Sequence, residues 1–352
     1  MSKICIIGDA HFRGSLPYAV AIEDGRQNEW NAVKKVIHET AELCDAVVFL
    51  GDNLNSRNNT SVILKEFVEF LKAFGDKDLY MICGNHERGG FSTAIDFLKK
   101  IDMPNWHIFT EISAINMQGR TAVFIPYMTP GVLGVENIEQ ATKKIIDSLQ
   151  DGDFLFHHHA MSGAKWSGGT AEHLNEIVLP REALEEKFSW IFGGHIHQPQ
   201  KFFEADHAGT YGTGNIFTNE VGDHEKFIWM LDTLVDKVTP IKLPVRGIYS
   251  VDFDELPLPD LMKIPSSSIV KCIITKRDTP MDMVKMALKR FDAHIIVENY
   301  PNERKRVALN ETGALDLSLQ SLLKIYSDVK LISYADLQDA FDSLEHQELR
   351  RT

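Results

Sequence analysis

Short apolar runs alternate with amphipathic stretches along the first third of the chain. Three runs are each followed by a glycine and a polar residue, the pattern of a buried strand that stops at a loop: Lys3–Ile7, Ala46–Leu50 and Leu79–Cys83. Between them, residues 26–43 and 60–74 carry apolar side chains at helical spacing. Two strand–helix–strand units in succession predict a parallel sheet at the centre of an α/β fold.

The same patterns predict further elements along the rest of the chain. Four more strands are expected at Thr121–Ile125, Phe154–Phe156, Trp190–Phe192 and Phe227–Leu231, and two more helices at residues 136–149 and 180–187. This order favours a two-layered sheet core flanked by helices. The segment Leu243–Gly247 indicates a boundary, after which Ile269–Thr275 and His294–Asn299 read as strands around a helix at residues 280–291. Leucines at helical spacing predict terminal helices over residues 315–346.

Composition restricts the class of protein. Of the 352 residues, 44% are hydrophobic and 25% are charged, which excludes wholesale disorder. No apolar run approaches the ~18 residues that a membrane helix needs, and the N-terminus lacks the pattern of a secretory signal. Four scattered cysteines, Cys5, Cys44, Cys83 and Cys272, fit reduced and mostly buried thiols, so we predict a cytoplasmic protein.

Almost all of the net negative charge lies before residue 240. Residues 1–239 hold 21 Lys and Arg against 33 Asp and Glu, whereas residues 240–352 hold 16 against 17, and the whole chain has a net charge of −13. The first part also holds 12 of the 14 histidines, which is compatible with metal binding. This balance argues against a protein that holds nucleic acid by bulk positive charge alone. Nucleic-acid binding would therefore need local contacts, metal ions or a basic partner.

Five short polar clusters follow predicted strands, where the loops at the edge of a parallel sheet build sites. They are Asp9-Ala10-His11, Gly51-Asp52-Asn53, Gly84-Asn85-His86-Glu87, His157-His158-His159 and Gly193-Gly194-His195-Ile196-His197. Their Asp, Asn and His side chains offer oxygen and nitrogen donors that suit Mn²⁺, Fe²⁺ or Zn²⁺. Asp52 alone after its strand is placed to bridge two ions about 3.5–4 Å apart. One such cluster is weak evidence, but five in order predict a site for two metal ions.

The order D-x-H, G-D, G-N-H-E, His and G-H-x-H resembles the calcineurin-like metallophosphoesterase superfamily. Three more stretches make the chain similar to the nuclease subunit of the SbcCD-type double-strand-break repair complex, most of all to bacteriophage recombination endonuclease subunits: Ile125-Pro126-Tyr127-Met128, Tyr211-Gly212-Thr213 and Phe227–Thr233. The resemblance implies a four-layer α-β-β-α sandwich. It also implies a nuclease domain at residues 1–240, a small α/β capping unit that contacts DNA at residues 241–310, and partner-binding helices at residues 311–352.

The resemblance assigns a role to each candidate residue. One ion would be held by Asp9, His11 and His197, the other by Asn85, His158 and His195, and Asp52 would bridge them. His86 would contact the scissile phosphate or protonate the leaving oxygen. His158 is preferred among the three histidines because Gly163 follows it by five residues, as in the phage relatives, and His157 is the alternative.

The implied activity is a Mn²⁺-dependent DNA nuclease, with Mg²⁺, Fe²⁺ and Zn²⁺ as alternative metals. It would act as a double-strand exonuclease and single-strand endonuclease in recombination, repair and replication. The implied partners are DNA and an ABC-type, SbcC-like ATPase, with the chain a homodimer inside a heterotetramer. For a phage protein the compartment would be the host cytoplasm. Two other functions stay open: a phosphodiesterase acting on small nucleotides, and a non-catalytic scaffold.

Basic and aromatic residues near the clusters have two interpretations each. Arg13, Arg57 and Arg88 follow three of the metal loops and either contact DNA phosphates or pair with nearby acids. Lys165 and Trp166, on a glycine-rich loop, either contact DNA or simply cover that loop.

Overall fold

The computed structural model describes residues 3–16, 26–117, 119–166, 169–171, 175–255, 258–276 and 279–297. The predicted terminal helices at residues 311–352 lie outside these residues. The division of the chain at residues 240 and 310 stays a prediction. Among the described residues, no helix is both long and apolar enough to cross a membrane.

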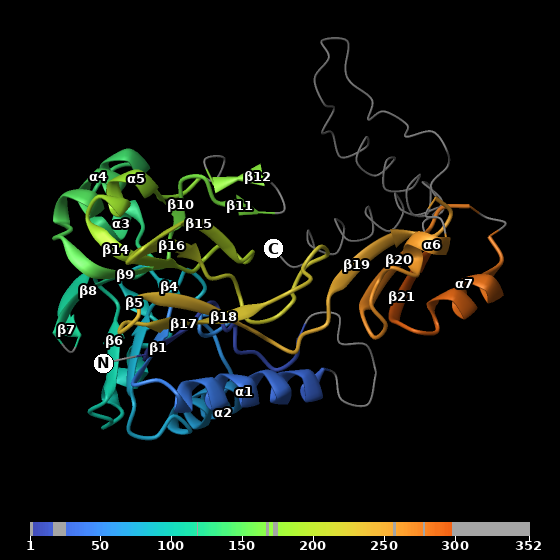
Figure 1. The fold of residues 1–352 in the computed structure, drawn as a ribbon, viewed down its shortest axis with the longest axis horizontal. Coiled ribbons are helices and arrows are strands. Elements are labelled where there is room, and N and C mark those ends of the chain that lie inside the picture. Colours follow the sequence, from blue (N-terminus) through green and yellow to red (C-terminus); the bar gives the residue numbers. More distant parts are fainter. Residues whose placement is uncertain are drawn as a thin grey trace, which may run out of the picture. The chain divides into compact units, whose positions relative to one another are not determined.

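One six-stranded sheet carries the first three predicted strands at its centre. Its order is β18-β17-β1-β2-β3-β6, with β1 (Lys3–Ile7), β2 (Ala46–Phe49), β3 (Asp78–Ile82), β6 (Trp106–Phe109), β17 (Phe227–Asp232) and β18 (Lys237–Lys242). β1, β2, β3 and β6 are parallel neighbours, and β17 runs antiparallel to β1. Helices α1 (Gln27–Glu42) and α2 (Ser61–Lys72) cover its outer face (Figure 1). The Thr60 hydroxyl caps α2 by accepting from the backbone N–H of Ile63.

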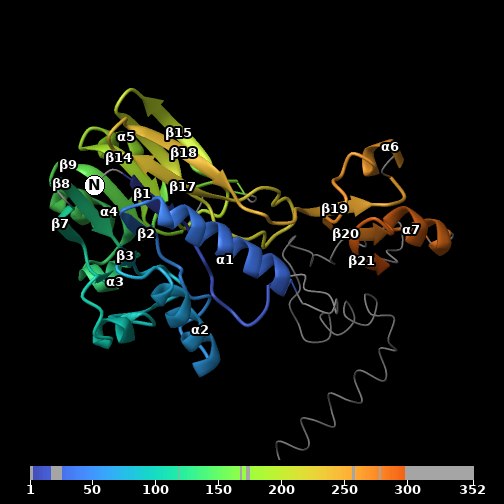
Figure 2. The ribbon, with the colours of Figure 1, turned by 60° about the horizontal axis from the view of Figure 1, so that its bottom comes forward.

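A second six-stranded sheet faces the first. Its order is β15-β16-β14-β9-β8-β7, with β7 (Ser113–Met117), β8 (Arg120–Ile125), β9 (Gly152–His157), β14 (Phe188–Gly193), β15 (Gln200–Ala205) and β16 (Ala208–Gly212). The four inner strands are parallel and the two edge strands antiparallel. Its outer face packs against α3 (Pro130–Leu133), α4 (Ile138–Ser148) and α5 (Arg181–Glu185), which lie away from α1 and α2 in Figure 1. Figure 2 shows the same elements turned by 60°.

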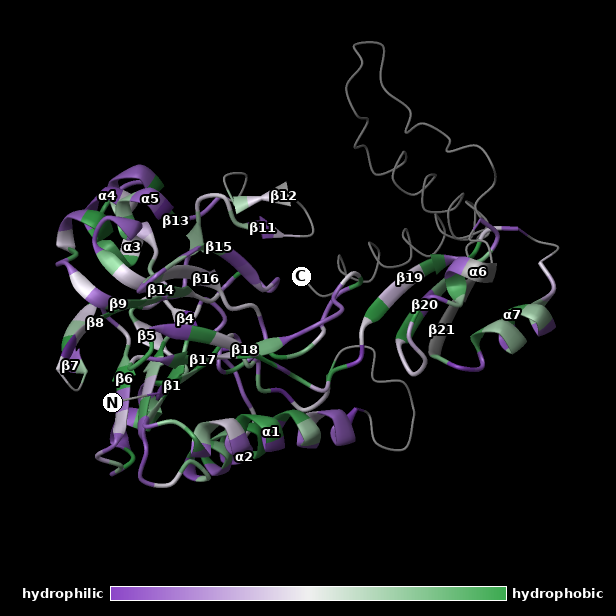
Figure 3. Cartoon of the chain, viewed as in Figure 1, coloured by the Kyte–Doolittle hydropathy of each residue, from purple (hydrophilic) through white to green (hydrophobic). Residues whose placement is uncertain are grey.

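The space between the two sheets is filled by apolar and aromatic side chains. Phe124, Phe156, Phe192 and Tyr211 stack in a row along the second sheet, with successive ring centroids 5.1, 5.9 and 5.3 Å apart. Phe109 of the first sheet stacks on Phe124 at 4.3 Å and so joins the two sheets. Two further apolar clusters lie under the helices on the outer faces, and Figure 3 shows the mixed polar and apolar residues of α1 and α2. The predicted four-layer α-β-β-α fold is therefore confirmed.

A small α/β unit follows the sandwich. Strands β19 (Ile248–Asp252), β20 (Ile269–Ile274) and β21 (Asp292–Val297) form a sheet in that order, with α6 (Leu258–Leu261) and α7 (Met281–Leu288). Val284 and Leu288 of α7 share an apolar cluster with Val270 and Cys272. The two predicted strands of this unit are found with ends shifted by one or two residues. The predicted helix is also found, but it is shorter than predicted. All four cysteines are buried and none forms a disulfide.

The remaining elements are short. They are β4 (Arg88–Gly89), β5 (Ser92–Thr93), the 3₁₀ helix η1 (Asp96–Lys100), β10 (Ala160–Met161), β11 (Lys165–Trp166), β12 (Gly169–Thr170) and β13 (Val178–Leu179). β10 pairs with β13, and β11 pairs with β12. These pieces follow the carboxyl ends of inner strands and shape the surface around the five polar clusters.

Candidate metal centre

The five polar clusters converge because the loops that carry them are tied together. The loop after β1 hydrogen-bonds to the loop after β2, with His11 N donating to Asp52 O at 2.8 Å. In the second sheet, the loop after β14 donates from Gly194 N to His157 O at 2.9 Å. The two sheets meet directly where His195 N donates to both carboxylate oxygens of Asp9, at 3.1 and 3.0 Å. One site is therefore built from both sheets.

The backbone at this site adopts a conformation that L residues rarely use. His11, Asp52 and His195 have φ angles of 45°, 45° and 75°. Non-glycine residues in this left-handed region carry local strain, which the surrounding structure must hold in place. Gly84 is required beside them, because a Cβ at this position would lie 2.1 Å from Asp52 Oδ1.

The first donor group contains Asp9, His11 and His197, whose ligand atoms lie within 4.8 Å of one another. The Nε2 atoms of His11 and His197 are 3.1 Å apart, and His197 Nε2 lies 3.9 Å from Asp9 Oδ2. Burial lowers the pKa of His11 to about 3 and that of His197 to about 4. Both imidazoles are therefore neutral near pH 7, which is the form that binds metal. Burial raises the pKa of Asp9 to about 6.

Asp52 lies between the donor groups. Its Oδ2 atom is 3.5 Å from His158 Nε2, 3.8 Å from His86 Nε2 and 3.9 Å from His11 Nε2. Burial acts to raise the pKa of Asp52, but the charge of His158 and its hydrogen bond outweigh burial and hold the pKa well below its usual range. Asp52 is therefore an ionised carboxylate in a position to contact both groups.

The second donor group gathers around the Asn85 amide. Its Oδ1 atom lies 3.0 Å from His158 Nε2 and 3.0 Å from His195 Nδ1. Asp9, Asp52 and His158 also form a group with ligand atoms within 4.8 Å. Burial acts to lower the pKa of His158, but the carboxylates of Asp52 and Asp9 raise it to about 9. An ion bound here would displace the His158 proton.

The three consecutive histidines point to three different places. The His158 ring has Nδ1 2.6 Å from Leu50 O and reaches Asp9 and Asp52. The His157 ring packs over Gly193, where an added Cβ would lie 2.5 Å from it. His159 Nε2 accepts from Met128 N at 3.1 Å. The structure thus brings His158 to the donor groups and places His157 and His159 outside them.

His86 lies at the opening of the site. Its side chain is 41% exposed, and its backbone N–H donates to Asp52 Oδ1 at 2.8 Å. Its Nδ1 atom is 2.9 Å from Asn55 O, an acceptor for a proton on Nδ1, so this contact orients the ring. The group His11, Asp52 and His86 also has ligand atoms within 4.8 Å.

Two buried or partly buried glutamates near the site have roles that the sequence did not indicate. Glu87 accepts from Leu54 N and from Gly84 N, both at 2.9 Å, and so joins the loops after β2 and β3. Glu176 Oε1 lies 2.6 Å from His195 Nε2. Glu176 belongs to none of the five clusters and lies between β12 and β13, so no local spacing could have identified it.

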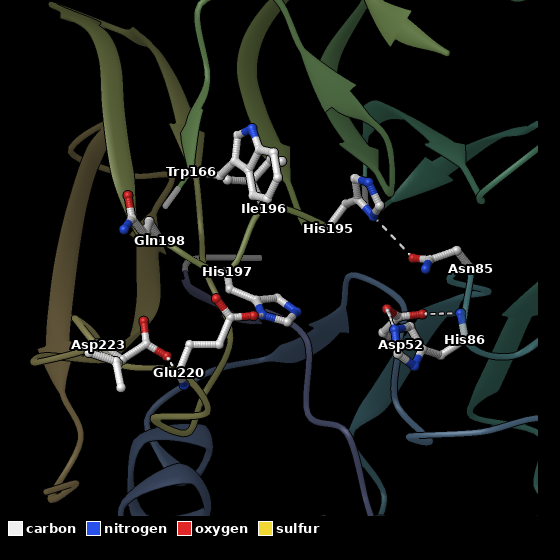
Figure 4. A pocket seen from close by; sticks show the side chains of 11 residues that line it. Asp52, Asn85, His86, Trp166, His195, Ile196, His197, Gln198, Glu220 and Asp223 are labelled. Carbon is white, nitrogen blue, oxygen red and sulfur yellow. Dashed lines mark hydrogen bonds and ion pairs between the residues drawn. The ribbon is translucent and has the colours of Figure 1, made fainter. Parts of the chain in front are cut away.

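A cavity of about 230 Å³ opens onto these residues (Figure 4). Its lining consists of Asp52, Asn85, His86, Trp166, His195, Ile196, His197, Gln198, Glu220, Val221 and Asp223. None of the three arginines that were predicted to contact DNA lines it.

The three arginines differ in their surroundings. Arg57 is exposed, and Arg13 is half-buried with Nη2 donating to Asn219 Oδ1 at 2.7 Å. Arg88 is only 8% exposed, and its guanidinium donates to Thr110 O at 2.6 Å. A buried guanidinium that donates to backbone carbonyl groups is poorly placed to bind a phosphate. The position of Arg88 therefore does not favour its predicted contact with DNA.

Two facing sheets bring Asp, His and Asn donors together at one edge, where they form groups that could hold metal ions. Residues 2–199 match the family described as Calcineurin-like phosphoesterase, and the chain belongs to that family. A comparison with curated proteins found no significant match.

Solved structures that match this chain share little sequence with it. A hypothetical protein from Thermus thermophilus has 12% identity and a TM-score of 0.40, covering 69% of this chain and 100% of its own. A hypothetical protein from Pyrococcus horikoshii has 10% identity and a TM-score of 0.35, covering 75% and 95%. Chaetomium thermophilum Vps29 has 10% identity and a TM-score of 0.28, covering 68% and 95%.

Proposed function

We propose that this chain is a metal-dependent DNA nuclease that hydrolyses phosphodiester bonds. The observation that carries the proposal is three overlapping donor groups, two of which share Asp52, beside an open cavity with His86 at its mouth. Family membership supports phosphoester hydrolysis. The choice of DNA as substrate rests on the resemblance to SbcCD-type nuclease subunits. In this proposal the enzyme degrades duplex ends and cuts single strands.

The donor set fits two divalent ions. Asp9, His11 and His197 would hold one ion, Asn85, His158 and His195 the other, with Asp52 between them. Mixed oxygen and imidazole donors suit Mn²⁺, and also Fe²⁺ and Zn²⁺. Bound ions would supply Lewis acidity toward the phosphoryl group and activate water for attack.

His86 would serve the leaving group. The contact between Nδ1 and Asn55 O fixes its ring, and Nε2 lies on the side of Asp52. From this position, Nε2 can contact the scissile phosphate or carry a proton to the leaving oxygen. Arg13 and Arg57 remain candidates for contacts with flanking phosphates.

An ATPase partner of the SbcC type belongs to the same proposal, with the chain acting as a homodimer in a heterotetramer. The net charge of −13 supports a need for help in holding DNA. A basic partner would provide the long-range attraction that this chain lacks.

The test is cleavage of end-labelled duplex DNA with Mn²⁺, with EDTA and without. We expect metal-dependent shortening, reduced by about 10²–10⁴-fold in His86→Ala because a general acid is lost. His207→Ala serves as a control, because His207 is 77% exposed and pairs with Asp236 outside the cavity. Hydrolysis of a small phosphodiester without DNA cleavage, even with the ATPase present, would instead favour the small-nucleotide phosphodiesterase.

A further inference from the structure

The cavity has two unlike walls. One wall carries the donor side chains Asn85, His86 and Asp52. Another part of the lining includes Trp166 and Ile196, which Figure 4 draws apart from Asn85 and His86. This apolar part lies in the same cavity as the donors, and nothing in the proposed hydrolysis uses it.

Trp166 is the most exposed tryptophan of the chain. It is 40% exposed, whereas Trp106, Trp190 and Trp229 are buried and Trp30 is half-buried. A large aromatic surface left at the mouth of a polar site is free to cover an apolar ligand face.

The position of Trp166 is fixed by its neighbours. Gln200 holds the backbone of Lys165 twice: its Oε1 accepts from Lys165 N, and its Nε2 donates to Lys165 O, both at 2.7 Å. Trp166 pairs with Gly169 in the β11–β12 ladder. Ala171 N also donates a hydrogen bond to Ala164 O at 2.8 Å. The backbone that carries the ring is thus held at the rim before any ligand arrives.

The charged residues around the cavity determine which kind of chemical group can bind beside Trp166. The described residues that line it include no Lys or Arg, whereas Glu220 and Asp223 contribute carboxylates, of which Asp223 pairs with the buried Lys226. A run of phosphates meets no Lys or Arg side chain in this lining, whereas an uncharged aromatic ring needs none. A nucleobase has such a ring next to its own phosphate, and bases stack on tryptophan in a sequence-tolerant way.

We propose that Trp166 stacks on the nucleobase adjacent to the scissile phosphate. This inference rests on the proposed nuclease function and adds a base-binding subsite to it. A base stacked on Trp166 has left its own helical stack, so the nucleotide at the cut must be unpaired. The subsite therefore selects single strands and frayed ends at the step of cleavage.

The first test is binding in EDTA, which needs no catalysis. Single-stranded oligonucleotide should quench the fluorescence of the wild-type protein, and Trp166→Phe should remove most of that quench. Anisotropy of a labelled oligonucleotide should show binding weakened about 5- to 150-fold in Trp166→Ala, and largely retained in Trp166→Phe. Phe203→Ala is the matched control, because Phe203 is 42% exposed and lies outside the cavity lining.

The second test compares cleavage of oligonucleotides with and without one abasic site next to the scissile bond. Wild type should cut the abasic strand more slowly, and Trp166→Ala should cut both at similar rates. Trp166→Ala that binds and cuts like wild type overturns the stacking subsite and leaves the nuclease intact. Quenching by dAMP through Trp166, without DNA hydrolysis even when the ATPase is present, supports the subsite and rejects DNA as substrate.

Discussion

The Oε1 atom of Glu176 lies 2.6 Å from Nε2 of His195, while Nδ1 of the same ring lies 3.0 Å from Asn85 Oδ1. A carboxylate in this position holds a proton on Nε2 and leaves the lone pair of Nδ1 directed at the donor group. Glu176 therefore orients a residue that would hold metal, without being one of the predicted ligands.

Glu176→Gln should weaken Mn²⁺ binding about 10- to 100-fold, the usual effect of losing a partner behind a metal-ligating histidine. Isothermal titration of the protein with Mn²⁺ measures this affinity directly. Glu182→Gln is the control, because Glu182 is 70% exposed on α5. Equal affinities of wild type and Glu176→Gln would show that the contact only packs the loop before β13.

Metal binding should stabilise the fold, because the donors come from both sheets. At a free Mn²⁺ concentration 100 times the dissociation constant, binding adds about 2.7 kcal/mol to the free energy of unfolding. Differential scanning calorimetry with Mn²⁺ and with EDTA should show the rise in Tm. His158→Ala should lose most of that rise and His207→Ala should keep it. A Tm indifferent to Mn²⁺ in wild type would speak against a bound ion.

Glu29 anchors a buried network of charges. It accepts from Arg26 Nη2 at 2.5 Å and from Arg246 Nε at 3.0 Å, and so joins the start of α1 to the segment before β19. Glu29→Ala leaves Arg26 buried without its carboxylate, so we expect a loss of about 3–5 kcal/mol in unfolding free energy. Glu39→Ala removes an exposed i,i+4 pair with Lys35 and should cost less than about 1 kcal/mol. Urea unfolding measures the loss of unfolding free energy in both variants. Similar losses in Glu29→Ala and Glu39→Ala would refute a stabilising role for the buried network.

The stability of the metal-free protein should depend on the protonation of Glu87. Burial raises the pKa of Glu87 from 4.5 to about 7, so between these pH values the folded chain holds this proton and the unfolded chain does not. The contribution of Glu87 to stability is therefore full below about pH 4.5 and falls as pH rises through 7. Urea unfolding in EDTA of wild type and Glu87→Gln, at several pH values, isolates this effect. A difference that grows in favour of wild type as pH rises would mean that the N–H groups of Gly84 and Leu54 keep the carboxylate ionised.

The buried strands were predictable because both of their faces are apolar. β1 was predicted and found at Lys3–Ile7, with Ile4 to Ile7 all buried. The edge strands β7 and β15 were missed, since one face of each meets water and carries polar residues, as in Gln200–Ala205. A short strand with that composition reads as a loop until its pairing partner is known.

The candidate site was predictable as far as its residues followed strands. The clusters could be placed at the carboxyl ends of their strands from order alone, because parallel strands of one sheet end on the same side. The meeting of the two sheet edges, as where His195 N donates to Asp9, was not encoded in that order. The contact between Glu176 and His195 spans 19 residues and depends on the pairing of β10 with β13, which no local pattern encodes. The burial of Arg88 was equally hidden, because its partner Thr110 O is a backbone group.

The row of rings between the sheets has a consequence for how this protein can evolve. Phe109, Phe124, Phe156, Phe192 and Tyr211 set the separation of the sheets, and each sheet supplies part of the donor set. The distance between the two halves of the donor set therefore depends on how these rings pack. Close-packed interiors feel the loss of a single methylene. A change of ring size here would shift one half of the donor set against the other, so sequence drift is constrained at residues that are not themselves donors.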